Sequence, residues 1–108
     1  MRNAPAFLLC LGSLCATAVH ADEPLGKQVF AQHCAECHAP GFGHPGTQRL
    51  GWSRGERYAI LEQRKDLTAG YIRAIVRHGL LEMPPFRPTE ISEADLDQLA
   101  AYLAAKGR

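Results

Sequence analysis

The chain has 108 residues, which is the length of one small domain. Its 12 basic and 11 acidic side chains leave a formal net charge of +1, so no strongly basic field directs the protein to nucleic acid. A domain of this size buries a small fraction of its surface and is only marginally stable, so it gains from a disulfide, a metal or another bound group.

The first 21 residues differ from the rest of the chain. Arg2 precedes an apolar run over residues 6–19, which leads into the small-residue stretch VHA. This layout predicts a secretory signal peptide cleaved after Ala21, and the run is too short for a membrane anchor. We expect residues 1–21 to be removed and residues 22–108 to form one periplasmic domain with no stable membrane anchor.

Four helices are predicted in the remaining chain, the first of them over residues 24–37. The Gly- and Pro-rich stretch HAPGFGHPGTQRLG that follows is interpreted as a loop. Ser53 and Glu56 have the spacing of a capping box, so a second helix is expected to begin there and to reach Arg64. The residues expected to face inward from it are Tyr58, Ile60 and Leu61.

The last two helices have clear N-terminal caps. Thr68 is expected to cap a third helix that ends near Gly79, with Ile72, Ile75, Val76 and Leu80 at helical spacing. The stretch LEMPPFRPTE contains three prolines and cannot be the interior of a helix. Ser92, with Asp95 three residues later, predicts the start of the last helix. Its apolar stripe is Leu96, Leu99, Ala100 and Leu103. No alternating strand pattern competes, so an all-α fold is predicted.

Cys34, Cys37 and His38 form a Cys-x-x-Cys-His motif, which is the signature of covalent haem c attachment. The two thiols lie about one helical turn apart, which matches the vinyl groups along one edge of a porphyrin, and the histidine that follows can bind the iron. A redox disulfide belongs beside a βαβ pattern, and structural zinc needs four ligands, so both alternatives are less favoured. One covalent haem would also give this small helical domain a group to fold around.

Met83 is the expected iron ligand opposite His38. It is the only methionine left after signal cleavage, and it lies between two helices, just before two prolines that stiffen the backbone. A methionine opposite a histidine raises the reduction potential, which suits an electron carrier. The alternatives for this position are His33, His44 and His78. An enzyme with an open haem face and a purely structural secreted domain are the other functions considered, and a ligand at Met83 argues against the open face.

The chain resembles the class I c-type cytochromes, which are small monohaem electron carriers. The resemblance rests on Gly26 and Phe30 before CAECH, on the MPPF loop, and on SEADLDQLAAYL with its Tyr102. It implies about four helices wrapped around one covalent haem, with Gly26 and Phe30 packed against Tyr102 and Leu99. It also implies that the carbonyl of a proline after the motif, best matched by Pro45, accepts a hydrogen bond from the proximal histidine.

Within that family, AGYIRAIVRHGLLEMPPF is similar to the cytochrome subunit of flavin-dependent phenol oxidoreductases of the p-cresol methylhydroxylase type. The extra segment from Ser53 to Arg64 departs from that pattern. The resemblance implies an electron carrier rather than an enzyme. Its redox partners would be a periplasmic dehydrogenase with a flavin or quinone cofactor and a terminal oxidase or another cytochrome.

Overall fold

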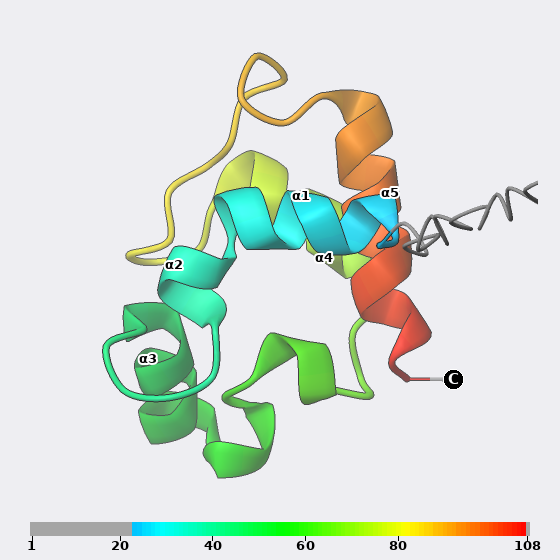
Figure 1. Cartoon of the computed structure of the whole chain (residues 1–108). Coiled ribbons are helices and arrows are strands. Elements are labelled where there is room, and N and C mark those ends of the chain that lie inside the picture. Colours follow the sequence, from blue (N-terminus) through cyan, green and yellow to red (C-terminus); the bar gives the residue numbers. More distant parts are fainter. Residues whose placement is uncertain (1–22, 108) are drawn as a thin grey trace, which may run out of the picture.

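The computed structural model describes residues 23–107. These residues form five α-helices and two short 3₁₀ turns, and they contain no strand (Figure 1). The helices are α1 (Leu25–His33), α2 (Ala35–His38), α3 (Pro45–Arg54), α4 (Ala69–His78) and α5 (Glu93–Ala105). The all-α prediction is therefore confirmed. The predicted signal peptide, residues 1–21, lies outside the described residues.

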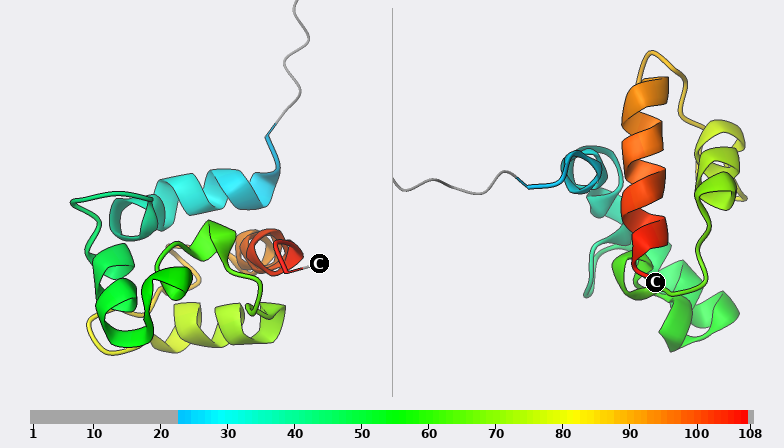
Figure 2. Two further views of the ribbon diagram at one scale, coloured as in Figure 1. Left: turned by 90° about the horizontal axis from the view of Figure 1, so that it is seen from below. Right: turned by 90° about the vertical axis from the view of Figure 1, so that its right-hand side faces the viewer.

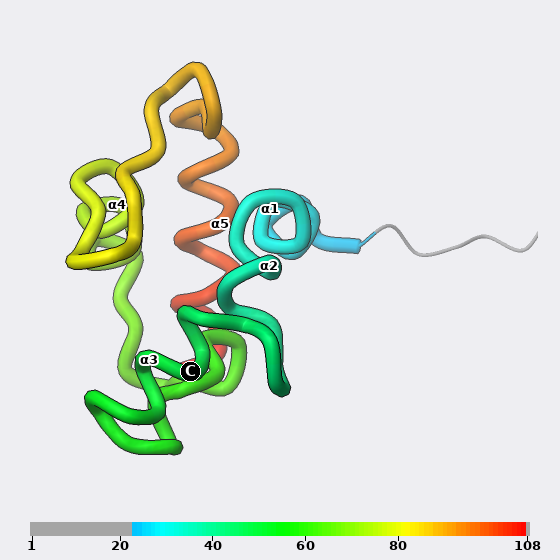
Figure 3. Tube along the Cα trace, turned by 90° about the vertical axis from the view of Figure 1, so that its left-hand side faces the viewer, coloured from blue at the N-terminus to red at the C-terminus, as the bar shows by residue number. Residues whose placement is uncertain are grey.

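Helix α5 is the centre of the fold, with α1 on one side of it and α4 on the other (Figures 2 and 3). Ser92 caps the helix as predicted, because its side-chain oxygen accepts a hydrogen bond from the backbone N–H of Asp95 at 3.1 Å. The predicted apolar stripe is fully buried. Burial of one such leucine contributes about 1.5–3 kcal/mol, so this stripe is the main source of core stability.

The crossing of α1 and α5 depends on a glycine. A Cβ at Gly26 would lie 2.2 Å from the carbonyl oxygen of Gln98 and 2.4 Å from Cβ of Tyr102, so only glycine allows this approach. Phe30 is 3% exposed and belongs to the same apolar cluster as Leu99, with Tyr102 packed against it. The packing between the end helices that the resemblance implied is confirmed.

Helix α4 and the segment after it match most of their predictions. Leu80, which was expected in the helical pattern, instead lies beyond the end of α4 and is 40% exposed. The hydroxyl of Thr68 accepts a hydrogen bond from the N–H of Tyr71 at 3.2 Å, and Ile72 and Val76 are buried. The helix ends at Gly79, which has a φ of 72°. The proline-rich stretch 81–90 is not helical, as expected.

The predictions for residues 24–64 need three corrections. The first helix is not continuous, because the backbone at Cys34 leaves the helical path at a φ of −118° and separates α1 from α2. The stretch interpreted as a loop contains most of α3. This helix begins at Pro45, a position where the missing N–H of proline costs nothing.

The capping box at Ser53 and Glu56 is the third prediction that is wrong. Ser53 lies in the last turn of α3, where its hydroxyl donates to the carbonyl oxygen of Arg49 at 2.8 Å. Gly55, with a φ of 103°, ends that helix, and only the 3₁₀ turns Glu56–Tyr58 and Leu61–Gln63 follow. The three residues expected to face inward are half-buried, and the buried residues of the segment from Ser53 to Arg64 are Ala59 and Arg64.

Candidate haem site

The Cys-x-x-Cys-His motif occupies one helical turn. The backbone carbonyl of Cys34 accepts hydrogen bonds from the N–H groups of Cys37 (3.2 Å) and His38 (2.9 Å), which fixes the three side chains relative to one another. No disulfide joins Cys34 to Cys37, and Cys37 is exposed. Within residues 23–107, no group of three or more His, Cys, Asp or Glu side chains is arranged to hold a metal ion, so nothing there supports the zinc alternative.

Burial distinguishes Cys34 from a redox-active cysteine. Loss of solvent, with a smaller contribution from the neighbouring Cys37, raises the pKa of Cys34 to about 12. Redox-active cysteines instead have a lowered pKa, because the thiolate is the reacting form. The thioredoxin-type alternative is therefore disfavoured by the site as well as by the absence of strands in residues 23–107.

Cys34 and His38 line an apolar cavity of about 90 Å³. The wall is almost entirely aliphatic and comes from several elements, and it includes Leu50, Leu67, Ile72, Ile75, Val76 and Leu103. The apolar chemistry of this lining, with Cys34 and His38 in it, suits a large apolar ring.

Met83 is half-buried and lines the same cavity as His38. The three histidines that compete for the second axial position do not line it. His78 is exposed, and Nδ1 of His44 lies 2.8 Å from the carbonyl oxygen of Glu36. The cavity therefore brings together the histidine and the methionine that the sequence singled out.

The backbone around Met83 is held in a tight turn. Leu80 and Met83 exchange two backbone hydrogen bonds of 3.0 and 2.9 Å, and Leu81 between them has a φ of 52°. A Cβ at Gly79 would lie 2.6 Å from the carbonyl oxygen of Met83. Glycine is therefore required at position 79 both by its own left-handed backbone and by the close approach of the methionine loop.

The imidazole of His38 packs against the first turn of α3. A Cβ at Gly46 would lie 2.6 Å from Cε1 and 2.8 Å from Nδ1 of His38, so the absence of a side chain there makes room for the ring. Burial lowers the pKa of His38, which favours the neutral imidazole that binds metals. Its Nδ1 is buried and has no hydrogen-bond partner among residues 23–107. Pro45 directly precedes Gly46, and its role as acceptor for Nδ1 stays a prediction.

Arg64 is a site residue that the sequence reasoning missed. It is 8% exposed. Among the residues that line the cavity it is the only arginine or lysine, and none of them is an aspartate or a glutamate. Its Nε and Nη2 donate to the two carboxylate oxygens of Asp66 at 2.9 and 2.6 Å, which lowers the pKa of Asp66 and raises that of Arg64. Two of the five guanidinium N–H donors are used in this way within residues 23–107.

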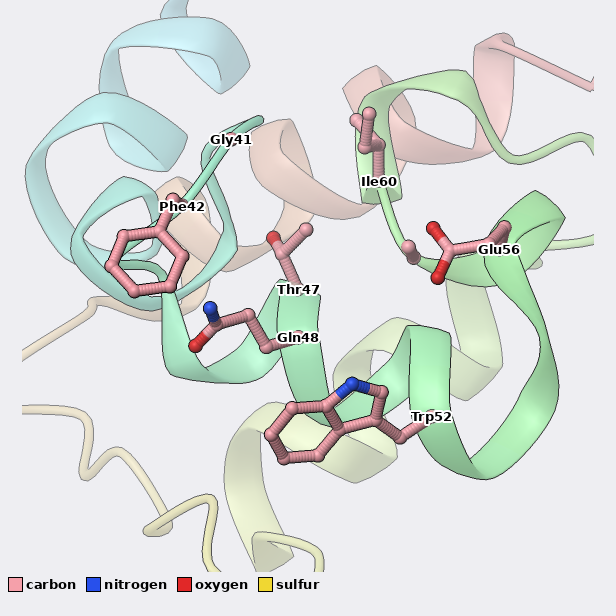
Figure 4. Close-up of a pocket in the computed structure, with 8 residues that line it drawn as sticks. Gly41, Phe42, Thr47, Gln48, Trp52, Glu56 and Ile60 are labelled. Atoms are coloured by element: carbon pink, nitrogen blue, oxygen red, sulfur yellow. The ribbon is translucent and has the colours of Figure 1, made fainter.

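A second hollow shares no lining residue with this cavity. It lies between the loop that carries Phe42 and helix α3, with Trp52 and Gln48 along its rim (Figure 4). Phe42 is 95% exposed and Trp52 is 80% exposed. The hollow contains no cysteine or histidine, so it is separate from the candidate haem site.

Comparison with known proteins identifies the family. The family model described as "Cytochrome C oxidase, cbb3-type, subunit III" matches residues 21–103, which is most of the chain. The chain belongs to the cytochrome c family. This result confirms the resemblance to class I cytochromes and the small helical fold that it implied.

Two relatives agree with that assignment. Cytochrome c6 of Synechocystis is 34% identical over 97 residues, which cover 90% of this chain and 76% of that protein. The 4-cresol dehydrogenase (hydroxylating) cytochrome c subunit of Pseudomonas putida is 32% identical over 80 residues. That match covers 74% of this chain but only 58% of the relative. No solved structure matches the chain with significance.

As a member of the cytochrome c family, the protein carries covalently attached haem c and transfers electrons, and it is not an enzyme in its own right. The alternatives of a catalytic haem protein and a structural secreted domain are therefore dropped. No helix among residues 23–107 combines the length and the apolar character that crossing a membrane requires.

Proposed function

We propose that this cytochrome c carries single electrons in the periplasm from a dehydrogenase to a respiratory acceptor, through a haem iron held by His38 and Met83. The observation that supports this proposal best is that both side chains line one apolar cavity, His38 from α2 and Met83 from the loop before α5. Haem c supplies a one-electron iron couple when it is attached.

The three residues of the Cys-x-x-Cys-His motif have different roles in binding the haem. Cys34 and Cys37 would hold it through thioether bonds, and His38 would offer a neutral imidazole to the iron. Because Nδ1 of His38 is buried against α3 and has no partner, an acceptor there would stabilise the ring orientation. We assign this acceptor to the carbonyl of Pro45, as the resemblance implies.

The rest of the cavity determines the reduction potential. The thioether of Met83 is a neutral, soft ligand that favours the reduced metal, and an aliphatic wall disfavours any additional positive charge. Arg64 lies in that wall, and a guanidinium group there would suit the carboxylate groups on the edge of a haem. Both features suit an electron carrier of raised potential.

The location is inferred from the N-terminal segment of the chain, and the partners are inferred from one of the relatives. We assign residues 1–21 to a cleaved signal peptide and residues 22–108 to the mature domain, which places the protein in the periplasm. Since one relative is named as a subunit of a dehydrogenase, we assign the donor to a dehydrogenase with a flavin or quinone cofactor. The acceptor would be a terminal oxidase or another cytochrome.

The loop around Met83 is the surface best suited to meet these partners. Leu81 is 83% exposed, and Pro84 and Pro85 are also exposed, although Met83 in the same loop reaches the cavity. A small apolar contact with charges only at its rim favours short-lived complexes, which an electron shuttle needs.

The ligand assignment is tested by removing the sulfur. In Met83→Ala, haem stays attached, the methionine–iron charge-transfer band at the red end of the oxidised spectrum disappears, and the midpoint potential falls. His78→Ala is the matched control, since this histidine is exposed and lies outside the cavity wall, and it keeps the wild-type band and potential. An unchanged band in Met83→Ala would eliminate Met83, and loss of a bis-histidine spectrum in His78→Ala would replace it with His78.

A further inference from the structure

A largely buried cation helps to join the segment that carries Met83 to α4. Arg77 lies in the last turn of α4, and its side chain is only 17% exposed. Its Nη1 donates to the carbonyl oxygen of Phe86 at 3.1 Å, and its Nη2 donates to the carbonyl oxygen of Ile91 at 2.9 Å. These two carbonyls lie near the two ends of the stretch that connects Met83 to α5.

The same guanidinium also reaches the start of α5. Its Nε and Nη2 lie 3.1 and 2.7 Å from one carboxylate oxygen of Glu93, the first residue of that helix. A planar guanidinium can bind three acceptors in fixed directions, whereas a lysine ammonium is a single point charge on a flexible stem. Arg77 therefore ties α4, the methionine loop and α5 together at one place.

The short chain between Met83 and Phe86 transmits this restraint. Both intervening residues are prolines, whose φ angles are fixed near −65°. Phe86 is held to α4 twice, because its N–H also donates to the carbonyl oxygen of Val76 at 2.7 Å. On the other side, Met83 is paired with Leu80 through two backbone hydrogen bonds. A stiff segment held at both ends leaves the Met83 side chain few ways to leave the cavity wall.

We propose that Arg77 is a positioning residue for the axial methionine. By holding the carbonyls of Phe86 and Ile91, it keeps the loop in the conformation in which Met83 faces the iron. This inference rests on the proposed function, in which Met83 is the distal ligand. Without Arg77, the loop opens more often, and external ligands reach the iron more readily.

The same two helices provide a matched control. Arg73 lies one turn before Arg77 on α4 and pairs with Asp97 of α5 at 2.8 Å. Both side chains of that pair are largely exposed, and no hydrogen bond joins Arg73 to the residues of the methionine loop among residues 23–107. Arg73→Gln therefore removes a link between α4 and α5 and leaves the loop restraints in place.

The experiment uses the complete haem-containing protein with Arg77→Gln, Arg73→Gln and Met83→Ala. The readouts are the methionine–iron charge-transfer band and the rate at which cyanide binds the oxidised iron. In Arg77→Gln we expect a weakened band and a cyanide rate raised by about tenfold or more, which corresponds to the loss of one charge-assisted hydrogen bond. Arg73→Gln is expected to keep the wild-type band and rate.

A wild-type band and cyanide rate in Arg77→Gln, with the band lost in Met83→Ala, would overturn the role of Arg77 alone. A band that survives in Met83→Ala would instead overturn the ligand assignment. Equal changes in Arg77→Gln and Arg73→Gln would also overturn the inference, because general loosening of α4 against α5 would then explain both. If Arg77→Gln does not fold, Arg77→Lys provides the test: a faster cyanide rate supports the role, and a wild-type rate contradicts it.

Discussion

Replacement of Phe30 by alanine tests the packing between α1 and α5. The side chain is 3% exposed and belongs to the main apolar cluster, so its removal leaves a cavity between the end helices. Such truncations cost about 3–5 kcal/mol. A small domain has a total stability of only about 5–15 kcal/mol, so the loss is a large share of it.

The assay is urea unfolding of the oxidised haem-containing protein, followed by circular dichroism. The same loss corresponds to a melting temperature lower by roughly 12–40 °C, since a domain of this size shifts by about 4–8 °C for each kcal/mol. Phe42→Ala is the matched control, because that phenylalanine is 95% exposed, and it should change stability by less than about 0.5 kcal/mol. A loss below about 1 kcal/mol in Phe30→Ala would refute the assigned register of α1 on α5.

Two further predictions follow from the described contacts. Gly79→Ala should lower the free energy of unfolding in urea by about 1–3 kcal/mol and weaken the methionine–iron band. The reason is that position 79 has a φ of 72° and that its Cβ would meet the carbonyl oxygen of Met83. Gly70→Ala is the control and should not destabilise the protein, because nothing lies within 4 Å of a Cβ at that position. Burial and the hydrogen bond to Glu62 raise the pKa of Tyr102 from its usual 10.0 to about 12. The unfolded chain therefore loses this proton first, and stability falls as pH rises from 10 to 12. Unfolding at pH 8 and pH 11 should show a smaller fall in Tyr102→Phe, and an equal fall would contradict this cause.

Helices with local signals could be predicted, and α3 could not. Thr68 and Ser92 cap α4 and α5 through contacts within their own first turns, so the sequence alone contains that information. Helix α3 has no apolar period and is rich in glycine. It is held by contacts with α2, such as the bond from the hydroxyl of Thr47 to the carbonyl oxygen of Ala39 at 2.9 Å. No pattern within α3 itself indicates such a contact.

In the candidate haem site too, some residues could be predicted from the sequence and others could not. The Cys-x-x-Cys-His motif is a single turn, so its spacing predicted its chemistry, and Met83 stood out because of its position in a proline-rich loop. Arg64 and Arg77 could not be predicted, because an arginine side chain usually faces solvent. Only the tertiary fold places Arg64 in the cavity wall and Arg77 against the carbonyls of Phe86 and Ile91.

The central claim is that His38 and Met83 hold the iron together, and the oxidised optical spectrum of the wild-type protein tests it most directly. The account predicts a charge-transfer band at the red end, which requires sulfur bound to iron, in protein that keeps its colour on the chain after acid–acetone extraction. A spectrum without that band, from protein with covalently attached haem, would contradict ligation by Met83.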